Sequence, residues 1–388
     1  MVGCCVAFMS RLLCGGEICL NAFSIAIVTL CFYRRFMSDC FISGLCFGSV
    51  IDNISSSSVT DIPDYAQHMR GATALVTGGA GFIGSNIVNA LLSVGSRVRV
   101  LDNLSTGDRR NLVGVTTSPL AELIVGSVSE ATAVRHAVAG CSHVFHLAAM
   151  VGISQSVHEP DKHFNSNILG TEIVLRESAA AKVSSVVFTS SSAVYGLTPI
   201  IPSSESDPLV AASPYAAGKA QGEVFTESYA RTNNTHAASL RLFNVFGPRQ
   251  SASGAYAAAI AAFLRAAQLQ EPASLFGTGE QTRDFVPVAN VVQAFLRASD
   301  PRRNLRGDRF NIGLGYATSL RQLLEMIADI TQIKIPPHLL PPRDADSPHS
   351  CADISAATSV LGFLPHVSMK NGLRETWNWL QSHANLPT

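Results

Sequence analysis

The sequence feature that most constrains the fold is a short apolar segment that runs directly into three evenly spaced glycines. Residues Ala72–Thr77 combine apolar and β-branched side chains, which is typical of a buried strand. Gly78, Gly81 and Gly84 follow at once. The next segment is amphipathic, with an apolar side made of Ile87, Val88, Leu91 and Leu92. The pattern predicts a strand, a tight glycine turn and a helix that packs back onto a sheet.

Strand and helix patterns continue to alternate after this unit. Further strands are expected at Arg97–Leu101, Leu123–Val125, His143–Leu147, Ser185–Ser190 and Ser239–Phe243, and helices notably at Asn165–Ala181 and Tyr215–Thr232. Such alternation predicts an α/β fold with a doubly wound parallel sheet of the Rossmann type, whose ligand crevice lies beyond the carboxyl ends of the strands. We expect this domain to span residues 70–245, and residues 246–388 to form a smaller, partly interleaved lobe that mainly binds substrate.

Asp102 supplies the second half of a dinucleotide-binding pattern. It lies 18 residues after Gly84, at the end of the second predicted strand. Glycines let the backbone approach a pyrophosphate, and the N-terminus of the next helix offers it free N–H groups. A carboxylate at this point accepts hydrogen bonds from an adenosine ribose and repels a 2′-phosphate. The pattern therefore predicts a site that favours NAD over NADP.

Tyr215 and Lys219 carry the strongest signal for chemistry. They lie four residues apart on a predicted helix and so share one face, where the ammonium is expected to lower the pKa of the phenol. The run Ser190–Ser192 ends a predicted strand at the expected crevice, where a hydroxyl can hold a substrate oxygen while the phenol moves its proton. Strand-end capping is the alternative role for these serines. Tyr195 is the weaker candidate, because Pro199 follows it at the spacing where Lys would stand.

Motifs distributed along the chain resemble those of extended short-chain dehydrogenase/reductases, and specifically of nucleotide-sugar 4-epimerases. In order they read TGGAGFIGSN, LDNLSTG, HLAA, SSSAVYG, YAAGK, RLFNVFGPRQ and GTGEQTRDF. The segment FNVFGPRQ followed by GAYAAAI is most similar to the UDP-N-acetylglucosamine/UDP-glucose 4-epimerase branch. This resemblance implies NAD-dependent epimerisation of a UDP-sugar at C4 through a transient 4-keto intermediate. It also implies a homodimer.

The resemblance assigns roles to individual residues. The catalytic group would be Ser191, Tyr215 and Lys219. Besides the three glycines, the NAD site would contain Phe82, Ile83, Asp102, Asn103, Leu147, Ala148, Ala149, Tyr215, Lys219 and Phe243. The nucleotide diphosphate sugar would face Ser191, Ser192, Asn244, Arg249, Tyr256, Arg283 and Arg343. Arginine suits this task because its planar fork binds phosphate oxygens bidentately.

Three departures from the family pattern concern ligand contacts. Ser127 follows Gly126 where the family usually has an acidic residue near adenine, so NAD is expected to bind less tightly. Gly152 removes one sugar contact that a serine often makes in related epimerases. Pro348 stands where an arginine often lies near the phosphates.

Two alternative functions remain open. A 4,6-dehydratase or decarboxylase shares the fold, but the dehydratases that the chain resembles carry Thr-Asp-Glu at the strand end, where this chain has Ser191-Ser192-Ala193. A non-catalytic NAD-binding sensor or scaffold would not need the intact Ser191, Tyr215 and Lys219. No metal is expected, because the chain has no HExxH motif.

Composition limits the partners and the location. The chain has 28 basic and 28 acidic residues, so it has no cationic excess for nucleic-acid binding. Most of its nine cysteines lie in the first 46 residues, and the body, with two, is expected to be reduced and cytoplasmic. Residues 1–68 are expected to be an extension. The apolar run Ile18–Tyr33 is shorter than the roughly 20 residues of a membrane-spanning helix, which leaves open a dispensable or misassigned start, a membrane anchor or a cleaved signal.

Overall fold

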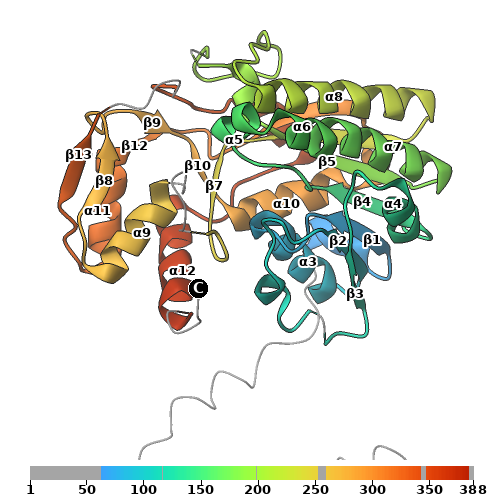
Figure 1. Cartoon of the computed structure of the whole chain (residues 1–388), viewed down its shortest axis with the longest axis horizontal. Helices are drawn as coiled ribbons and strands as arrows, with labels where there is room; N and C mark the ends of the chain where they lie inside the picture. The colour runs from blue at the N-terminus through green and yellow to red at the C-terminus, as the bar shows by residue number, and fades with distance from the viewer. Residues whose placement is uncertain (1–62, 116, 198, 252–258, 342–346, 384–388) are drawn as a thin grey trace, which may run out of the picture. The chain divides into compact units, whose positions relative to one another are not determined.

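Seven parallel strands form one sheet in the order β11-β6-β5-β4-β1-β2-β3 (Figure 1). The structure is a computed structural model and describes residues 63–115, 117–197, 199–251, 259–341 and 347–383. The strands are β1 (Thr73–Thr77), β2 (Arg97–Asp102), β3 (Ala121–Val125), β4 (His143–His146), β5 (Ser185–Ser191), β6 (His236–Leu242) and β11 (Arg306–Ile312). The chain runs outward from β1 to β3 and then returns to β4 beside β1, so the strand order reverses between β1 and β4. A doubly wound sheet binds its ligand at such a reversal.

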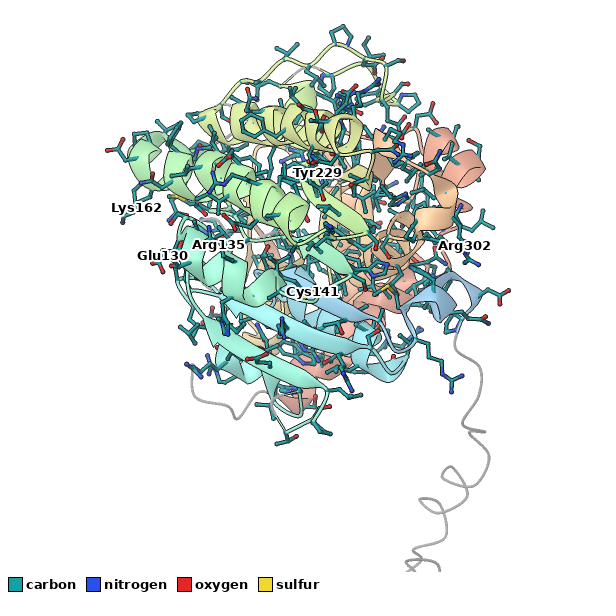
Figure 2. All side chains as sticks on the ribbon, turned by 90° about the vertical axis from the view of Figure 1, so that its right-hand side faces the viewer. Glu130, Arg135, Cys141, Lys162, Tyr229 and Arg302 are labelled. Carbon is teal, nitrogen blue, oxygen red and sulfur yellow. The ribbon has the colours of Figure 1, made fainter. Side chains whose placement is uncertain are left out.

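Helices cover both faces of the sheet. On one face, α3 (Phe82–Ser93) and α10 (Val288–Ala298) share a hydrophobic core with Ala74 and Val76 of β1. On the other, α4 (Ala131–Val138), α7 (Gly170–Ala180) and α8 (Pro214–Thr232) share a core with Leu75. Figure 2 labels Cys141 and Tyr229, two members of this second core. Successive residues of β1 therefore enter opposite cores, which explains why the whole strand is apolar.

The second half of the chain contributes to two regions. Its strand β11 and helix α10 return to the large sheet. Its remaining elements build a smaller lobe: β7 (Asn244–Phe246), α9 (Ala259–Leu269), β8 (Ala273–Phe276), β9 (Thr282–Arg283), β10 (Phe285–Pro287), β12 (Thr318–Ser319), α11 (Leu320–Thr331), β13 (Pro337–Leu340) and α12 (Met369–Ser382). Buried Asp284 joins the two regions by accepting hydrogen bonds from the backbone N–H groups of Leu314, Gly315 and Ala352.

The predicted doubly wound α/β fold is confirmed. The predicted helix Asn165–Ala181 is in two parts, because a π-helical turn, η3 (Phe164–Leu169), precedes α7. Strand β11 was not predicted, since its charged residues interrupt the apolar pattern. Across the described ranges, no helix combines the length and the apolar character that a bilayer crossing needs. The run Ile18–Tyr33 lies outside the described residues.

A short 3-10 helix before β1 packs into the body of the fold. This helix, η1 (Asp64–Met69), buries Ala66 and Met69 in the same core as α3 and α10. Ser96 Oγ donates to the Met69 carbonyl at 2.7 Å. Residues 64–69 therefore pack with the body of the fold.

We predict that Met69→Ala lowers the free energy of unfolding by about 2–4 kcal/mol, because it leaves a cavity at a fully buried side chain. Urea denaturation of the whole chain measures this. Arg70→Ala is the matched control, since Arg70 is the exposed neighbour and its removal should change stability by less than about 0.5 kcal/mol. Equal stability of the two variants would show that η1 is not part of the cooperative unit.

Candidate active site

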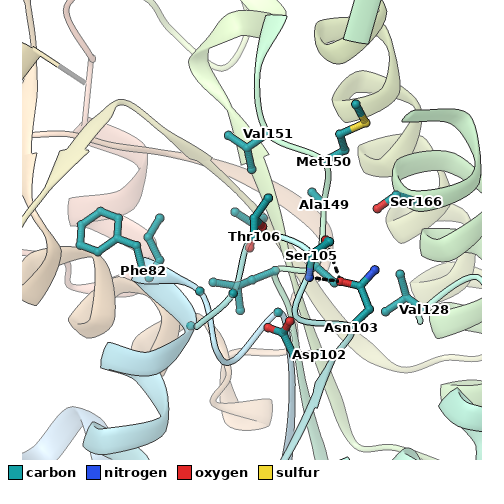
Figure 3. Close-up of a pocket in the computed structure, with 18 of the residues that line it drawn as sticks. Phe82, Asp102, Asn103, Ser105, Thr106, Val128, Ala149, Met150, Val151 and Ser166 are labelled. Atoms are coloured by element: carbon teal, nitrogen blue, oxygen red, sulfur yellow. Dashed lines mark hydrogen bonds between the residues drawn. The ribbon is translucent and has the colours of Figure 1, made fainter. Parts of the chain in front are cut away.

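A cavity of about 960 Å³ opens beyond the carboxyl ends of the central strands (Figure 3). Gly78, Asp102, Leu147 and Ser191 line it, and they follow or end β1, β2, β4 and β5. All the residues predicted for the cofactor line this one cavity: Gly78, Gly81, Phe82, Ile83, Gly84, Asp102, Asn103, Leu147, Ala148, Ala149, Tyr215, Lys219 and Phe243. The volume is that of a site for a large organic ligand.

The glycine loop forms a cradle that side chains would fill. Gly78 has φ 69°, and a Cβ there would lie 2.8 Å from the Ala148 nitrogen. A Cβ at Gly84 would lie 2.2 Å from the Gly78 carbonyl oxygen. Helix α3 can therefore approach the turn after β1 only because Gly84 has no Cβ. Helix α3 starts at Phe82 with no side-chain cap at Gly81. Its first N–H groups and its positive dipole end therefore face the cavity, an arrangement that fits a pyrophosphate.

Asp102 is fixed at the edge of this cradle. Its Oδ2 accepts from the Ala80 N–H at 2.9 Å, and its Oδ1 accepts from the Leu104 N–H at 2.8 Å. Each carboxylate oxygen retains a further acceptor position, and the side chain lines the cavity. Beside it, Asn103 Oδ1 accepts from the backbone and hydroxyl of Ser105, as Figure 3 shows. The carboxylate is thus oriented for a ribose diol.

A hydrogen-bond chain joins the ends of β1 and β4. Thr77 Oγ1 accepts from the N–H groups of Leu147 and Ala148, each at 3.2 Å, so its own proton goes to His146 Nδ1 at 2.7 Å. His146 Nε2 must then carry the ring proton, which it donates to Thr171 Oγ1 at 3.0 Å. The imidazole is therefore neutral. Burial, together with the Lys219 ammonium, lowers the pKa of His146 to about 3.

The N-terminus of α8 places Tyr215 at the cavity wall. Ser213 caps the helix by accepting from the Ala216 N–H at 3.1 Å. The Tyr215 N–H donates to Ser156 Oγ at 3.1 Å, which ties α8 to α5 (Ile153–His158). The ring of His163, in α6 (Pro160–His163), packs against the Tyr215 ring edge-on, with centroids 6.5 Å apart. Tyr215 is thus held at both its backbone and its ring.

Ser191, Tyr215 and Lys219 lie together in the cavity lining. The Ser191 hydroxyl is close enough to the Tyr215 phenol to lower the pKa of that phenol. Lys219 follows Tyr215 by one helical turn, with Nζ 5.9 Å from the Tyr215 ring centroid. Its ammonium donates to the Thr189 carbonyl at 2.7 Å. One phenol and one serine hydroxyl can therefore bind the same alcohol oxygen and pass a proton to or from it.

The expected direction of the Tyr215 pKa shift is wrong. Burial raises the pKa of the phenol, and the hydrogen bond with Ser191 opposes this rise only in part. The Lys219 ammonium lies 5.9 Å from the centroid of the Tyr215 ring and donates to the Thr189 carbonyl. Burial also lowers the pKa of Lys219 itself, to about 8, against the effect of the nearby Glu223 carboxylate.

The predicted substrate residues are less concentrated than the cofactor residues. Ser192 begins η4 (Ser192–Tyr195) directly after Ser191, but it is not part of the cavity lining. Asn244 begins β7, with Nδ2 3.5 Å from Ser350 Oγ. Tyr256 and Arg343 lie outside the described residues.

Two predicted arginines also lie outside the lining of the cavity. The Arg249 guanidinium lies against α3, where the Asn89 side-chain carbonyl, in its hydrogen-bonded orientation, accepts from Arg249 Nη1 at 3.0 Å. Arg283 donates from Nη1 to the Thr282 carbonyl at 2.9 Å and to the Pro348 carbonyl at 3.2 Å.

Several cavity residues were not predicted. They come from the turn after β2, the turn after β3 and the segment that includes α5 and α6: Ser105, Thr106, Gly107, Val128, Ser129, Met150, Val151, Gln155, Glu159, Lys162, Asn165 and Ser166. The Asn103-x-Ser105 spacing, which favours a side-chain-to-backbone turn, was a usable signal for the first turn. No local signal places α5 and α6 at the cavity, because tertiary packing against α8 does so.

Comparison with known proteins gives consistent matches. The model of the NAD dependent epimerase/dehydratase family matches residues 74–313. A UDP-glucose 4-epimerase of Mycolicibacterium smegmatis is 38% identical over 312 residues, which are 80% of this chain and 99% of that protein. A UDP-N-acetylglucosamine 4-epimerase of Methanobrevibacter ruminantium, solved with UDP-N-acetylmuramic acid, is 34% identical with a TM-score of 0.77 and covers 81% of this chain and 99% of its own. The Thermus thermophilus UDP-glucose 4-epimerase complex with NAD is 32% identical, with a TM-score of 0.72 and coverage of 80% and 99%.

We predict an acid loss of stability that depends on His146. Its pKa is about 3 in the folded protein and about 6.5 when unfolded, so the unfolded chain binds the extra proton between these values. Stability is therefore lost as the pH falls from about 6.5 toward 3. His146→Gln, which keeps an acceptor and a donor, should reduce this acid dependence by an amount on the order of a few kcal/mol.

Urea denaturation at pH 7.5, 6, 5 and 4 measures the effect. His158→Gln is the control, because His158 is exposed and should leave the acid dependence unchanged. Identical pH slopes for wild type and His146→Gln would contradict the assignment of a neutral, hydrogen-bonded imidazole.

Proposed function

Because the chain belongs to the NAD-dependent epimerase/dehydratase family, we propose that it inverts C4 of a UDP-sugar through a 4-keto intermediate. The observation that carries this proposal is that Ser191, Tyr215 and Lys219 line the same cavity as the glycine cradle. These residues lie where the sheet reverses its strand order, so a sugar alcohol bound there can be next to a dinucleotide. The compared proteins include 4-epimerases named for UDP-sugars, which supports this substrate class.

Each catalytic side chain has a distinct task in this proposal. The Tyr215 phenol oxygen exchanges a proton with the sugar 4-hydroxyl, and the Ser191 hydroxyl holds that oxygen in line. Lys219 fixes the turn of α8 that follows Tyr215 by donating to the Thr189 carbonyl. Bound NAD supplies the acceptor and later the donor of the C4 hydride. The keto sugar has to offer its opposite face before Tyr215 returns the proton, and this inverts the configuration.

The cradle residues bind and orient the cofactor in the same proposal. The N–H groups of Phe82 and Ile83 face the pyrophosphate, and Asp102 accepts from the adenosine ribose. The cavity edge formed by Leu147–Ala149 is fixed through Thr77 and His146. On the sugar-nucleotide side we retain Ser192, Asn244, Arg249, Tyr256, Arg283 and Arg343 as proposed contacts.

The dehydratase alternative lacks support in the cavity lining. Water elimination needs an added acid and base near the sugar. The carboxylates among the described lining residues are Asp102, which is held in the cradle, and Glu159 on the α5–α6 segment. Neither is at the end of β5. Incubation with separate UDP-sugars, followed by proton NMR of the C4 configuration, tests the proposed reaction and identifies the sugar.

Assembly and location are further parts of the proposal. We expect a homodimer formed through helices that flank the sheet, and analytical ultracentrifugation tests this. We also expect a cytoplasmic enzyme, with the nature of residues 1–68 decided by cell fractionation of the full chain. Recovery of the protein only in the membrane fraction would support an anchor and contradict the cytoplasmic expectation.

We predict that Tyr215→Phe lowers kcat by about 10²–10⁴-fold, because it removes the proton-transfer oxygen and leaves the ring packing intact. Tyr65→Phe is the control. Tyr65 lies in η1, outside the cavity lining and against Arg297, so loss of its hydroxyl should leave kcat unchanged. Near-normal turnover of Tyr215→Phe would contradict the assignment.

We predict that Ser127→Asp tightens NAD binding about fivefold, since a charge-assisted hydrogen bond is stronger than a neutral one by about 1 kcal/mol. Ser127 lines the cavity, and its Oγ accepts from the Ser129 N–H at 3.2 Å, a contact that Asp can keep. Calorimetry of wild type and variant measures Kd. Unchanged or weaker binding would mean that this turn does not contact the adenosine.

A further inference from the structure

A fully buried carboxylate, that of Glu223, lies on the same helix as Tyr215 and Lys219. Glu223 of α8 has 0% exposure, and Arg241 of β6, its buried ion-pair partner, has 1%. A second partner, the partly exposed Arg309 of β11, has Nε 3.2 Å from Glu223 Oε2. Arg241 Nε donates to Glu223 Oε1 at 2.9 Å, and Nη2 donates to Oε2 at 2.8 Å. Ser190 Oγ also donates to Glu223 Oε1, at 2.5 Å. The carboxylate therefore joins a helix to two neighbouring strands.

These contacts involve the positions adjacent to the proposed catalytic residues. Tyr215, Lys219 and Glu223 follow one another at four-residue intervals and so form one row along α8. Ser190 and Arg241 are directly opposite each other in the β5–β6 register, and Ser190 precedes Ser191. Glu223 therefore fixes Ser190 near the end of β5. Lys219, one helical turn earlier on α8, fixes the Thr189 carbonyl.

The pair is linked onward to β11 and to the segments that contain Ser203 and Asp353. Arg241 Nη1 donates to the Tyr195 hydroxyl at 2.9 Å, and that hydroxyl donates to Asn311 Oδ1. Asn311 Nδ2 donates to the carbonyls of Ser203, at 2.8 Å, and Asp353, at 3.1 Å. Every link is an intramolecular hydrogen bond between buried or half-buried groups, which gives the carboxylate one fixed position.

Folding alone does not account well for such a pair. Moving two charges out of water costs several kcal/mol for each ion, and apolar residues of similar size often stabilise a fold as much or more. The mutual attraction and the hydrogen bonds offset this cost only when the geometry is good. A buried ion pair next to a proton-transfer site can instead fix geometry and charge there.

We propose that Glu223 and Arg241 are positioning residues that keep Ser191 and Lys219 in register with Tyr215. This role rests on the proposed function of those three residues. Glu223 fixes Ser190 and thereby the backbone that carries Ser191, and it supplies the negative charge that keeps the Lys219 ammonium protonated. Arg241 orients the carboxylate through both of its oxygens.

The charged groups around Lys219 are consistent with this role. Tyr215 and Glu223 are on its own helix, His146 is at the end of β4, His163 is on α6 and Arg241 is on β6. Burial and the Lys219 charge lower the pKa of both histidines. In the described part of the chain, Glu223 is the carboxylate that raises the pKa of Lys219, against the larger lowering by burial. Loss of its charge should make Lys219 lose its proton at lower pH.

The test compares Glu223→Gln with Glu227→Gln in the full-length protein. Glu227 lies one turn further along α8 and makes partly exposed ion pairs with Arg231 and with Arg309, which also contacts Glu223. This control therefore separates the contacts of Glu223 with Arg241, Ser190 and Lys219 from the loss of a carboxylate beside Arg309. Glu223→Gln should lower kcat about ten- to hundredfold, with the KM for the UDP-sugar within about twofold. In alkaline solution, kcat declines as Lys219 loses its proton. For Glu223→Gln the midpoint of this decline should lie about one pH unit below that of wild type. Glu227→Gln should change neither kcat nor the pH at which kcat declines. Calorimetry should give a similar Kd for NAD in both variants.

A second pair of variants separates positioning from folding. Glu223→Leu combined with Arg241→Met removes both charges, so urea denaturation should find it more stable than Glu223→Gln, while kcat stays low. Ser190→Ala should fold normally and lower kcat, and it should not move the alkaline pH at which kcat declines. Recovery of kcat by the double variant, or identical kcat and pH profiles for Glu223→Gln and Glu227→Gln, would overturn the positioning role. A wild-type protein that turns over no UDP-sugar would instead contradict the proposed function.

Discussion

The contact of α8 with the end of β5 is the constraint on which the active site depends. Lys219 is buried, and its ammonium donates to the Thr189 carbonyl at 2.7 Å. An ammonium in this position needs a fixed acceptor and a nearby anion, because burial disfavours its charge. Thr189 supplies the acceptor and Glu223 the anion. The helix can therefore approach the strand closely, and Gly222, where a Cβ would lie 2.3 Å from the Phe188 ring, permits that approach.

The cradle for the dinucleotide is built on the same principle of close backbone approach. The missing Cβ at Gly84 lets α3 approach the glycine turn, and the missing Cβ at Gly78 lets that turn approach Leu147 and Ala148 after β4. The Thr77–His146 hydrogen bond fixes β1 against β4. The two halves of the site are thus held by separate contacts, one around α3 and the other around α8. The cavity between them is where a cofactor and a sugar alcohol can meet.

Local sequence patterns predicted the parts of the site that depend on backbone geometry. Gly78, Gly84 and Asp102 have spacings that a strand–turn–helix unit requires, and the Tyr215–Lys219 spacing requires only a helix. The side-chain environment could not be predicted in this way. The pKa of Tyr215 is raised rather than lowered, because burial and the direction of the Lys219 ammonium arise from tertiary packing.

The same distinction explains the other differences. Strand β11 contains Arg306, Asp308 and Arg309, and it completes the sheet from a distant part of the chain. Arg249 has the residue type expected of a phosphate ligand, yet its guanidinium lies against α3. Residue type and order identify which chemistry a segment can support, whereas contacts between segments decide where each side chain points.

The most direct test of the central claim uses a UDP-sugar that carries deuterium at C4. If Tyr215 exchanges only the hydroxyl proton and the C4 hydride goes to the cofactor and back, the epimerised product retains the deuterium at C4 in ordinary water. Proton NMR and mass spectrometry detect this. Inversion of C4 with replacement of the deuterium by solvent hydrogen would contradict hydride transfer beside the Ser191–Tyr215 pair and would overturn the account.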